Sequence, residues 1–195
     1  MTLSPTMSVD EMADHSPEAL GQSPTAAWLN FIESIVLPTM PPDLPFAIQG
    51  WAGMAFDRTS YADLAPDSVW ECWMAVHNQA AGYPSGLGAV RYRNASDLSS
   101  GVHIKPDMES IRTYWDENDS FLRDHYVFSL DRQWIIRLDQ DTTLFMGELD
   151  FMRSVVERLG GVAEVRRVMD DDLIGGCDDV VGLGGYIDGL LAPLS

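Results

Sequence analysis

The stretch LDQDTTLFMGELD, residues 138–150, carries the side chains of this sequence whose spacing is best suited to chemistry. It contains an Asp-x-Asp pair, Asp139 and Asp141, and acidic residues again at Glu148 and Asp150. Carboxylates in such a pattern serve as calcium ligands in a loop, as a catalytic or metal-binding pair, or as solvated groups in a turn between strands. The residues around them separate these three roles.

A calcium-binding loop of the EF-hand type beginning at Asp139 does not fit the spacing. Such a loop needs glycine at its sixth position and a ligand at its ninth, and this sequence has Leu144 and Gly147 there. The preceding segment WIIRL is also typical of a strand, whereas the loop follows a helix. A hairpin accounts for the same residues, because the Asp pair then lies in the turn and the later acids lie in the first turn of a helix, where the helix dipole favours anions.

A catalytic or metal-binding role for Asp139 and Asp141 is an alternative interpretation. Two carboxylates two residues apart on a continuing strand share one face of the sheet. A hydrolytic site would also need a general base, a His ligand or a third carboxylate, and His125 on the neighbouring predicted strand is the candidate. A His beside acidic turns is more often structural, so we predict no catalytic residue, no metal ion and no cofactor.

A second acidic stretch, MDDDLIGGCDDV, spans residues 169–180 and contains five acids around Cys177. A calcium loop starting at Asp170 fails, because Ile174 and Val181 occupy ligand positions. The pattern is typical of a solvated acidic loop. The alternative is an acidic face that binds a partner rich in Arg or Lys.

The other sequence motifs exclude several classes of enzyme. GLGGYIDG resembles a dinucleotide-binding loop but has Ile187 where the third glycine is needed, and no strand–helix–strand unit surrounds it. The sequence contains no phosphate-binding loop, no zinc-protease motif and no nucleophile elbow. His77 lies on the apolar face of a predicted helix, so we expect a hydrogen-bonded core residue there.

Charge is the strongest global feature of the sequence. The chain has 30 acidic and 12 basic residues and a formal net charge of −18. Direct binding to nucleic acid or to an anionic membrane is therefore disfavoured, since both require Lys and Arg. The charge favours a basic protein partner, and the alternative is that it serves only to keep the protein soluble. No apolar run is long enough to span a membrane and no export signal is apparent, so we expect a cytoplasmic protein in which Cys72 and Cys177 are buried or idle thiols.

The hydrophobic pattern predicts an α+β fold with a mainly antiparallel sheet and helices packed on one face. Apolar residues recur at helical spacing in four segments: 23–36, 69–80, 106–117 and 148–161. Strands are expected at 46–57 (broken near Gly50), 87–93, 102–104, 125–130, 134–138, 142–147 and 162–168. The end of the chain, residues 184–194, is expected to be irregular or weakly helical.

Residues 126–161 carry a resemblance. A strand, an Asp-Arg-x-Trp turn, a strand ending in Asp-x-Asp, a third strand and a closing helix resemble a pattern of small α+β immunity-type proteins of bacterial toxin systems. The resemblance implies an acidic protein that occludes a basic enzyme, with Trp134 packed inward. It assigns no functional residue.

We therefore predict a flexible acidic tail, residues 1–22, and a single α+β domain, residues 23–195. The expected function is non-enzymatic: an immunity-type inhibitor that occludes a basic toxin or effector through acidic surface. The alternatives are a metal-dependent hydrolase that uses Asp139 and Asp141, and a structural or adaptor protein that forms a homo-oligomer. The predicted partner-binding residues are Asp139, Asp141, Asp170, Asp171, Asp172, Asp178 and Asp179.

Overall fold

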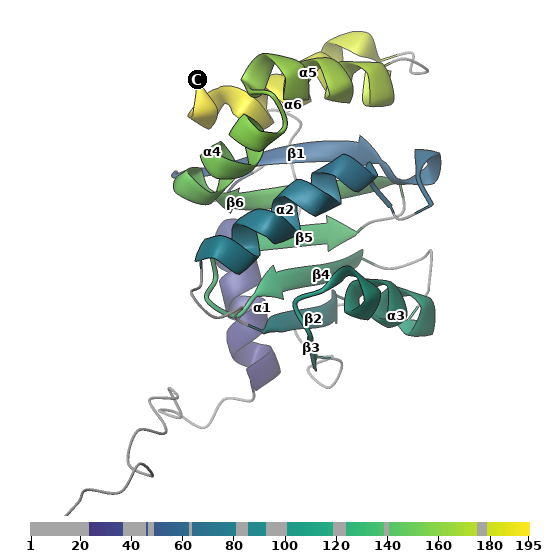
Figure 1. The fold of residues 1–195 in the computed structure, drawn as a ribbon, viewed down its shortest axis with the longest axis vertical. Coiled ribbons are helices and arrows are strands. Elements are labelled where there is room, and N and C mark those ends of the chain that lie inside the picture. Colours follow the sequence, from purple (N-terminus) through teal and green to yellow (C-terminus); the bar gives the residue numbers. More distant parts are fainter. Residues whose placement is uncertain are drawn as a thin grey trace, which may run out of the picture.

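The protein is built around one six-stranded antiparallel sheet, with the strand order β1-β6-β5-β4-β2-β3 (Figure 1). The computed structural model describes residues 24–36, 46, 49–62, 64–80, 86–92, 101–118, 124–138, 141–174 and 179–195. The strands are β1 (Trp51–Asp57), β2 (Leu87–Tyr92), β3 (Val102–Ile104), β4 (Asp124–Ser129), β5 (Trp134–Leu138) and β6 (Thr142–Glu148). The sheet and its helices confirm the predicted α+β class.

The helices lie on both faces of the sheet and at one of its edges. In Figure 1, α2 crosses in front of the sheet, α1 lies behind it, and α5 and α6 lie beyond β1. The helices are α1 (Pro24–Ile35), α2 (Asp67–Ala80), α3 (Met108–Asn118), α4 (Leu149–Arg158), α5 (Val162–Met169) and α6 (Val180–Leu191). The expected one-sided packing therefore describes α2, α3 and α4, and α1 is added on the opposite face.

Aromatic side chains join α2 and α4 to the centre of the sheet. Trp73 of α2 makes edge-to-face contacts with Trp134 of β5, Phe145 of β6 and Phe151 of α4, at ring-centroid distances of 5.6, 5.0 and 4.9 Å. Such geometry adds to the free energy that area burial alone provides. The Trp134 indole N–H also donates to Nδ1 of His77 at 3.1 Å, which confirms His77 as a hydrogen-bonded core residue.

The opposite face of the sheet packs against α1. Phe31 of α1 contacts Trp51 of β1 and Phe128 of β4, at centroid distances of 6.3 and 6.0 Å. Trp28, one helical turn earlier, contacts Phe128 at 5.3 Å. Because alternate residues of a strand point to opposite faces, Phe128 faces α1 while its neighbour Val127 faces the other helices.

The prediction of a last strand at residues 162–168 is wrong, because these residues form α5. Three valines suggested a strand, but Val165 and Met169 are buried at helical spacing. Glu164 pairs with Arg167, and Arg166 pairs with Asp170, at the (i, i+3) and (i, i+4) spacings that stabilise helices.

The C-terminus, expected to be irregular or weakly helical, is more regularly helical than predicted. Residues 180–191 form a regular helix, α6, despite four glycines. Ile187, Leu190 and Leu191 are buried against the rest of the core, and α6 contacts β1. Tertiary burial therefore outweighs the low helix propensity of glycine. The acidic segment Asp170–Ile174, expected as a loop, forms a π-helical turn that continues α5.

The proposed tail, residues 1–22, lies outside the described residues. No described helix combines the length and the apolar character needed to cross a lipid bilayer.

Two glycine substitutions should have opposite effects on stability. A Cβ at Gly88 would lie 2.4 Å from the Phe128 ring, which Trp28 and Phe31 hold in place. Gly88→Ala should therefore lower the free energy of unfolding by about 1–3 kcal/mol. A Cβ at Gly184, on α6, meets nothing within 4 Å, so Gly184→Ala should raise it by roughly 0.5–1 kcal/mol. Urea unfolding of the two variants measures both changes, and a stable Gly88→Ala protein would contradict the Phe128 contact.

Candidate functional site

The predicted hairpin between β5 and β6 exists, and Asp141 lies at its end with an exposed side chain. The backbone carbonyl of Asp141 accepts a hydrogen bond from the Arg58 N–H at 3.0 Å. This bond attaches the hairpin end to the short 3₁₀ turn Arg58–Ser60 that follows β1. Asp139 lies outside the described residues.

The C-terminal acidic residues are partly neutralised by two arginines of α5. The Arg166 Nε donates to both carboxylate oxygens of Asp170 at 2.9 Å, and its Nη1 contacts Asp188 of α6. Arg167 donates to Asp171 and to Glu164, each at 2.6 Å. These contacts are largely exposed, so each contributes little to stability. They do reduce the charge that this surface presents to a partner.

Asp172 has a structural role in addition to its charge. One carboxylate oxygen accepts the backbone N–H of Asp57 at 2.6 Å, and the other accepts the Tyr61 hydroxyl at 2.8 Å. Asp172 therefore attaches the C-terminal helices to the end of β1. The Asp179 carboxylate caps α6 by accepting the Gly182 N–H at 2.9 Å. Asp178 lies outside the described residues.

His125, the residue suggested as a base for a hydrolytic site, is buried in β4. Its Nδ1 is 2.9 Å from the Tyr114 hydroxyl, and its ring makes edge contacts with Tyr114 and Trp115 of α3. Asp141, by contrast, is exposed. Within the described residues, no three His, Cys, Asp or Glu side chains are grouped so that they could hold a metal ion.

Arg58 is a buried cation that the sequence pattern did not reveal. This residue is only 4% exposed, and its guanidinium lies 4.2 Å above the Trp115 ring. This contact is a cation–π interaction, which is stronger when it is desolvated. A cavity of about 90 Å³ lies beside Trp115, between α3 and the segment before α2. The sequence RTS after a strand indicates only a turn, so no local signal places this arginine in the core.

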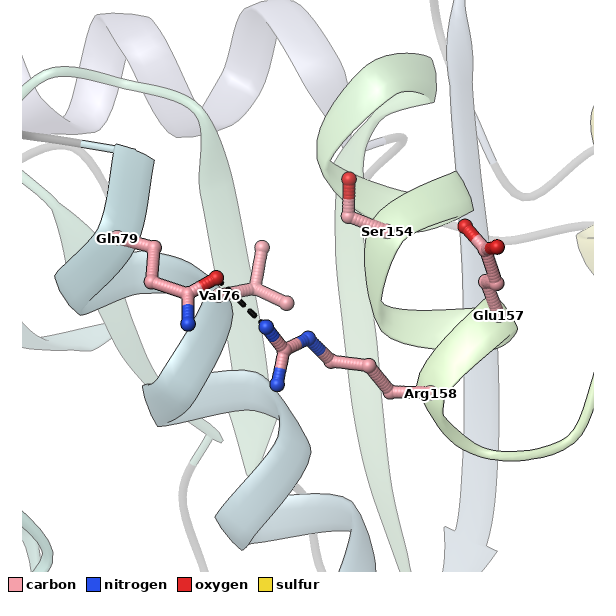
Figure 2. Close-up of a pocket in the computed structure, with 5 residues that line it drawn as sticks. All are labelled: Val76, Gln79, Ser154, Glu157 and Arg158. Carbon is pink, nitrogen blue, oxygen red and sulfur yellow. Dashed lines mark hydrogen bonds between the residues drawn. The ribbon is translucent and has the colours of Figure 1, made fainter.

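A groove of about 590 Å³ runs between α2 and α4, and Figure 2 shows the side chains that line it. The Arg158 Nη2 donates to the Gln79 side-chain oxygen at 2.6 Å and so bridges the two helices. The Ser154 hydroxyl donates to the Asp150 carbonyl within α4. That hydroxyl is therefore engaged by its own helix, and the charged residues that line the groove are Glu157 and Arg158. The arrangement favours contact with a ligand or partner over nucleophilic chemistry.

The helices α2, α3 and α4, which cover the face of the sheet opposite α1, form an acidic layer. On α2, α3 and α4, the exposed charged residues comprise seven acids and three arginines. The acids are Asp67, Glu71, Glu109, Asp116, Glu117, Asp150 and Glu157. Sequence reasoning missed this layer because its members are dispersed along the chain and come to the same face of the sheet only in the folded structure (Figure 1).

Comparison of the chain with protein families, with curated proteins and with solved structures finds no match in any of the three.

Replacement of Asp172 should destabilise the protein more than replacement of its neighbour. Asp172→Ala removes the acceptor of the partly buried Asp57 N–H and of the Tyr61 hydroxyl, so we expect a loss of about 1–3 kcal/mol in unfolding free energy. Asp171→Ala removes only an exposed ion pair and should change it by about 0.5 kcal/mol or less. Equal urea midpoints for the two variants would show that Asp172 does not hold β1.

The same contact should appear in the titration of Tyr61. Burial raises the pKa of Tyr61 from 10.0 to about 12, and the hydrogen bond to Asp172 and the negative charges of Asp172 and Asp57 contribute. Because the pKa is higher in the folded state, this stabilisation is complete below the unfolded pKa and is lost as the pH rises through the folded pKa. The difference in phenolate absorbance between the wild type and Tyr61→Phe isolates this residue. In an Asp172→Asn background the same difference should titrate closer to 10, and an unchanged midpoint would remove Asp172 as a cause.

Proposed function

We propose that the protein is a non-enzymatic, cytoplasmic binding protein of the immunity type, which occludes a basic toxin or effector through its acidic surface. The observation that carries this proposal is the acidic layer of α2, α3 and α4, which adds to the net charge of −18. An acidic surface steers a basic protein toward it and discriminates against acidic competitors.

The placement of the buried polar side chains supports a binding function over catalysis. Arg58, His77 and His125 are buried, and each contacts an aromatic ring of the core: Trp115, Trp134 and Tyr114 respectively. The Arg58 guanidinium and the two imidazoles therefore contribute to packing of the core. The exposed charged side chains of the described residues are mainly carboxylates, which suit an electrostatic interface.

Three acidic surfaces are available to a partner. The first is the β5–β6 hairpin end, where Asp141 lies; Asp139, two residues earlier in the sequence, lies outside the described residues. The second is the C-terminal cluster, in which Asp170 and Asp171 are paired internally and Asp179 caps α6. The third is the helical layer, where Arg153 pairs with Asp150 and the acids outnumber the arginines among the described exposed residues. Charge that is not neutralised internally contributes most to attraction, so we rank the helical layer above the C-terminal cluster.

The proposal predicts that a tagged form of the chain retains one basic protein from its source cells, in stoichiometric amount. Retention should be stronger at low than at moderate salt, because salt screens exposed charges. Mass spectrometry identifies the retained protein. Three charge-neutralised variants locate the surface, one for each candidate. They are Asp139→Asn with Asp141→Asn, then Asp170→Asn with Asp171→Asn, Asp178→Asn and Asp179→Ser, and finally Glu71→Gln with Glu157→Gln. Asp172 is left intact because it holds β1, and Asp179→Ser retains a side chain that can cap α6.

A matched control removes two exposed charges elsewhere. The control carries Glu33→Gln on α1 and Asp131→Asn in the β4–β5 turn, and it removes two negative charges, as the hairpin variant does. Binding should fall several-fold more in one of the cluster variants, or in Glu71→Gln with Glu157→Gln of the helical layer, than in this control. Equal binding by all variants at both salt concentrations would refute an acidic interface.

A further inference from the structure

The two edges of the sheet differ in how many other elements contact them. At the β1 edge, α5, α6 and the turn Asp170–Ile174 contact the strand, and Asp172 accepts the Asp57 N–H. At the other edge, β3 pairs with β2 on one side, and no other strand of the described residues pairs with it. Figure 1 shows β3 as the outermost strand, with α3 beside it. An unpaired strand edge is a template for another strand.

The register of the sheet identifies which backbone groups face outward at this edge. The Leu130 N–H donates to the Gly86 carbonyl, so alternate residues of β2 from Gly86 onward direct their backbone groups to β4. Leu87 and Ala89 therefore direct theirs to β3, where they pair with Ile104 and Val102. Because successive residues of a strand alternate in this respect, the N–H and C=O of His103 point away from the sheet. None of the described contacts occupies either group.

A groove beside this edge provides space for side chains. A volume of about 510 Å³ lies between β3 and α3. The Val102 side chain, one of the exposed large apolar residues of the described chain at 42% exposure, lies at its rim. Val102 and Ile104 share the face of the sheet that α3 covers, whereas His103 points to the other face and contacts Trp28 at 4.8 Å. An added strand would therefore place alternate side chains in the groove.

The lining of the groove is acidic. Asp107, Glu109 and Glu117 contribute three carboxylates, and Lys105 is the basic residue. The Ser110 backbone N–H donates to Asp107 at 2.7 Å, and this hydrogen bond lowers the pKa of Asp107, so this carboxylate stays charged. A segment that carries Lys or Arg at the positions that face α3 complements this lining.

We propose that β3 is a docking edge, at which an extended basic segment of the partner adds to the sheet as a seventh strand. The segment forms backbone hydrogen bonds with His103, and its alternate side chains lie between β3 and α3, near Glu109 and Glu117. This inference rests on the proposed function for the basic character of the segment, and it specifies the mode of binding.

A matched pair of substitutions at residue 103 tests the backbone contact. His103→Pro and His103→Ala both lose the ring contact with Trp28, but only proline removes the outward N–H. Proline is tolerated at such edge positions, since no bond to β2 is lost. The probes are peptides of roughly 10 residues, selected from a displayed random library with the whole wild-type chain as bait, and their Kd values are measured by fluorescence anisotropy.

We expect the selected peptides to be rich in Lys or Arg at alternate positions. His103→Pro should bind them about tenfold more weakly than His103→Ala, which is the effect of one lost backbone hydrogen bond. Glu109→Gln with Glu117→Gln should weaken binding several-fold at low salt and less at high salt. Methylation of alternate peptide nitrogens should abolish binding to the wild-type chain, which tests strand addition even if His103→Pro does not fold.

Three results would overturn the proposal: equal affinity of the proline and alanine variants, no enrichment of basic residues, or pairing of β3 with a second copy of this chain, seen as a dimer by light scattering. The proposed function fails separately. If a basic partner from the source cells binds the His103→Pro and His103→Ala chains equally, the acidic interface stands and the docking edge does not. If no basic partner binds the wild-type chain, the function itself is wrong.

Discussion

The buried indole of Trp134 is the constraint on which the packing of α2 and α4 against the sheet depends. Its side chain is fully buried in the central strand β5, and burial of an indole N–H without an acceptor is costly. His77 of α2 supplies that acceptor through Nδ1, which requires the neutral imidazole with its proton on the other nitrogen. Trp73 and Phe151 then pack around the same ring, so the positions of α2 and α4 over the sheet follow from one satisfied donor.

The sheet has two edges, at β1 and at β3, and the other elements of the described chain contact them differently. The C-terminal third is used largely to cover β1: α5 and α6 lie beside it, and Asp172 reaches the N–H of Asp57 and the hydroxyl of Tyr61. The acidic residues of this segment are thus structural groups as well as surface charge. At the opposite edge β3 is short, and its shortness limits indiscriminate pairing.

The meander β4-β5-β6 and the helix after it were predictable from local pattern, because alternation and helical spacing are strong over residues 125–158 and turn residues separate the segments. Residues 162–168 were not. Their valines favour a strand, and the ion pairs of Arg166 and Arg167 with acids a turn away, together with burial of Val165 and Met169, favour a helix. The regularity of the glycine-rich α6 was underestimated for the same reason: its stability comes from Ile187, Leu190 and Leu191 in the core, which local propensity does not report.

By itself the sequence determined the class of fold, the order of the central elements, the acidic character of the protein and the core position of His77, since each follows from composition or from spacing along the chain. Only the tertiary structure decided which acids act as surface charge. Asp170, Asp171 and Asp172 look alike in the sequence, yet two form exposed ion pairs and the third holds β1. The acidic layer, the buried Arg58 and the open edge of β3 likewise arise from segments far apart in the chain. Their properties depend on which groups become neighbours after folding, and a one-dimensional pattern does not contain that information.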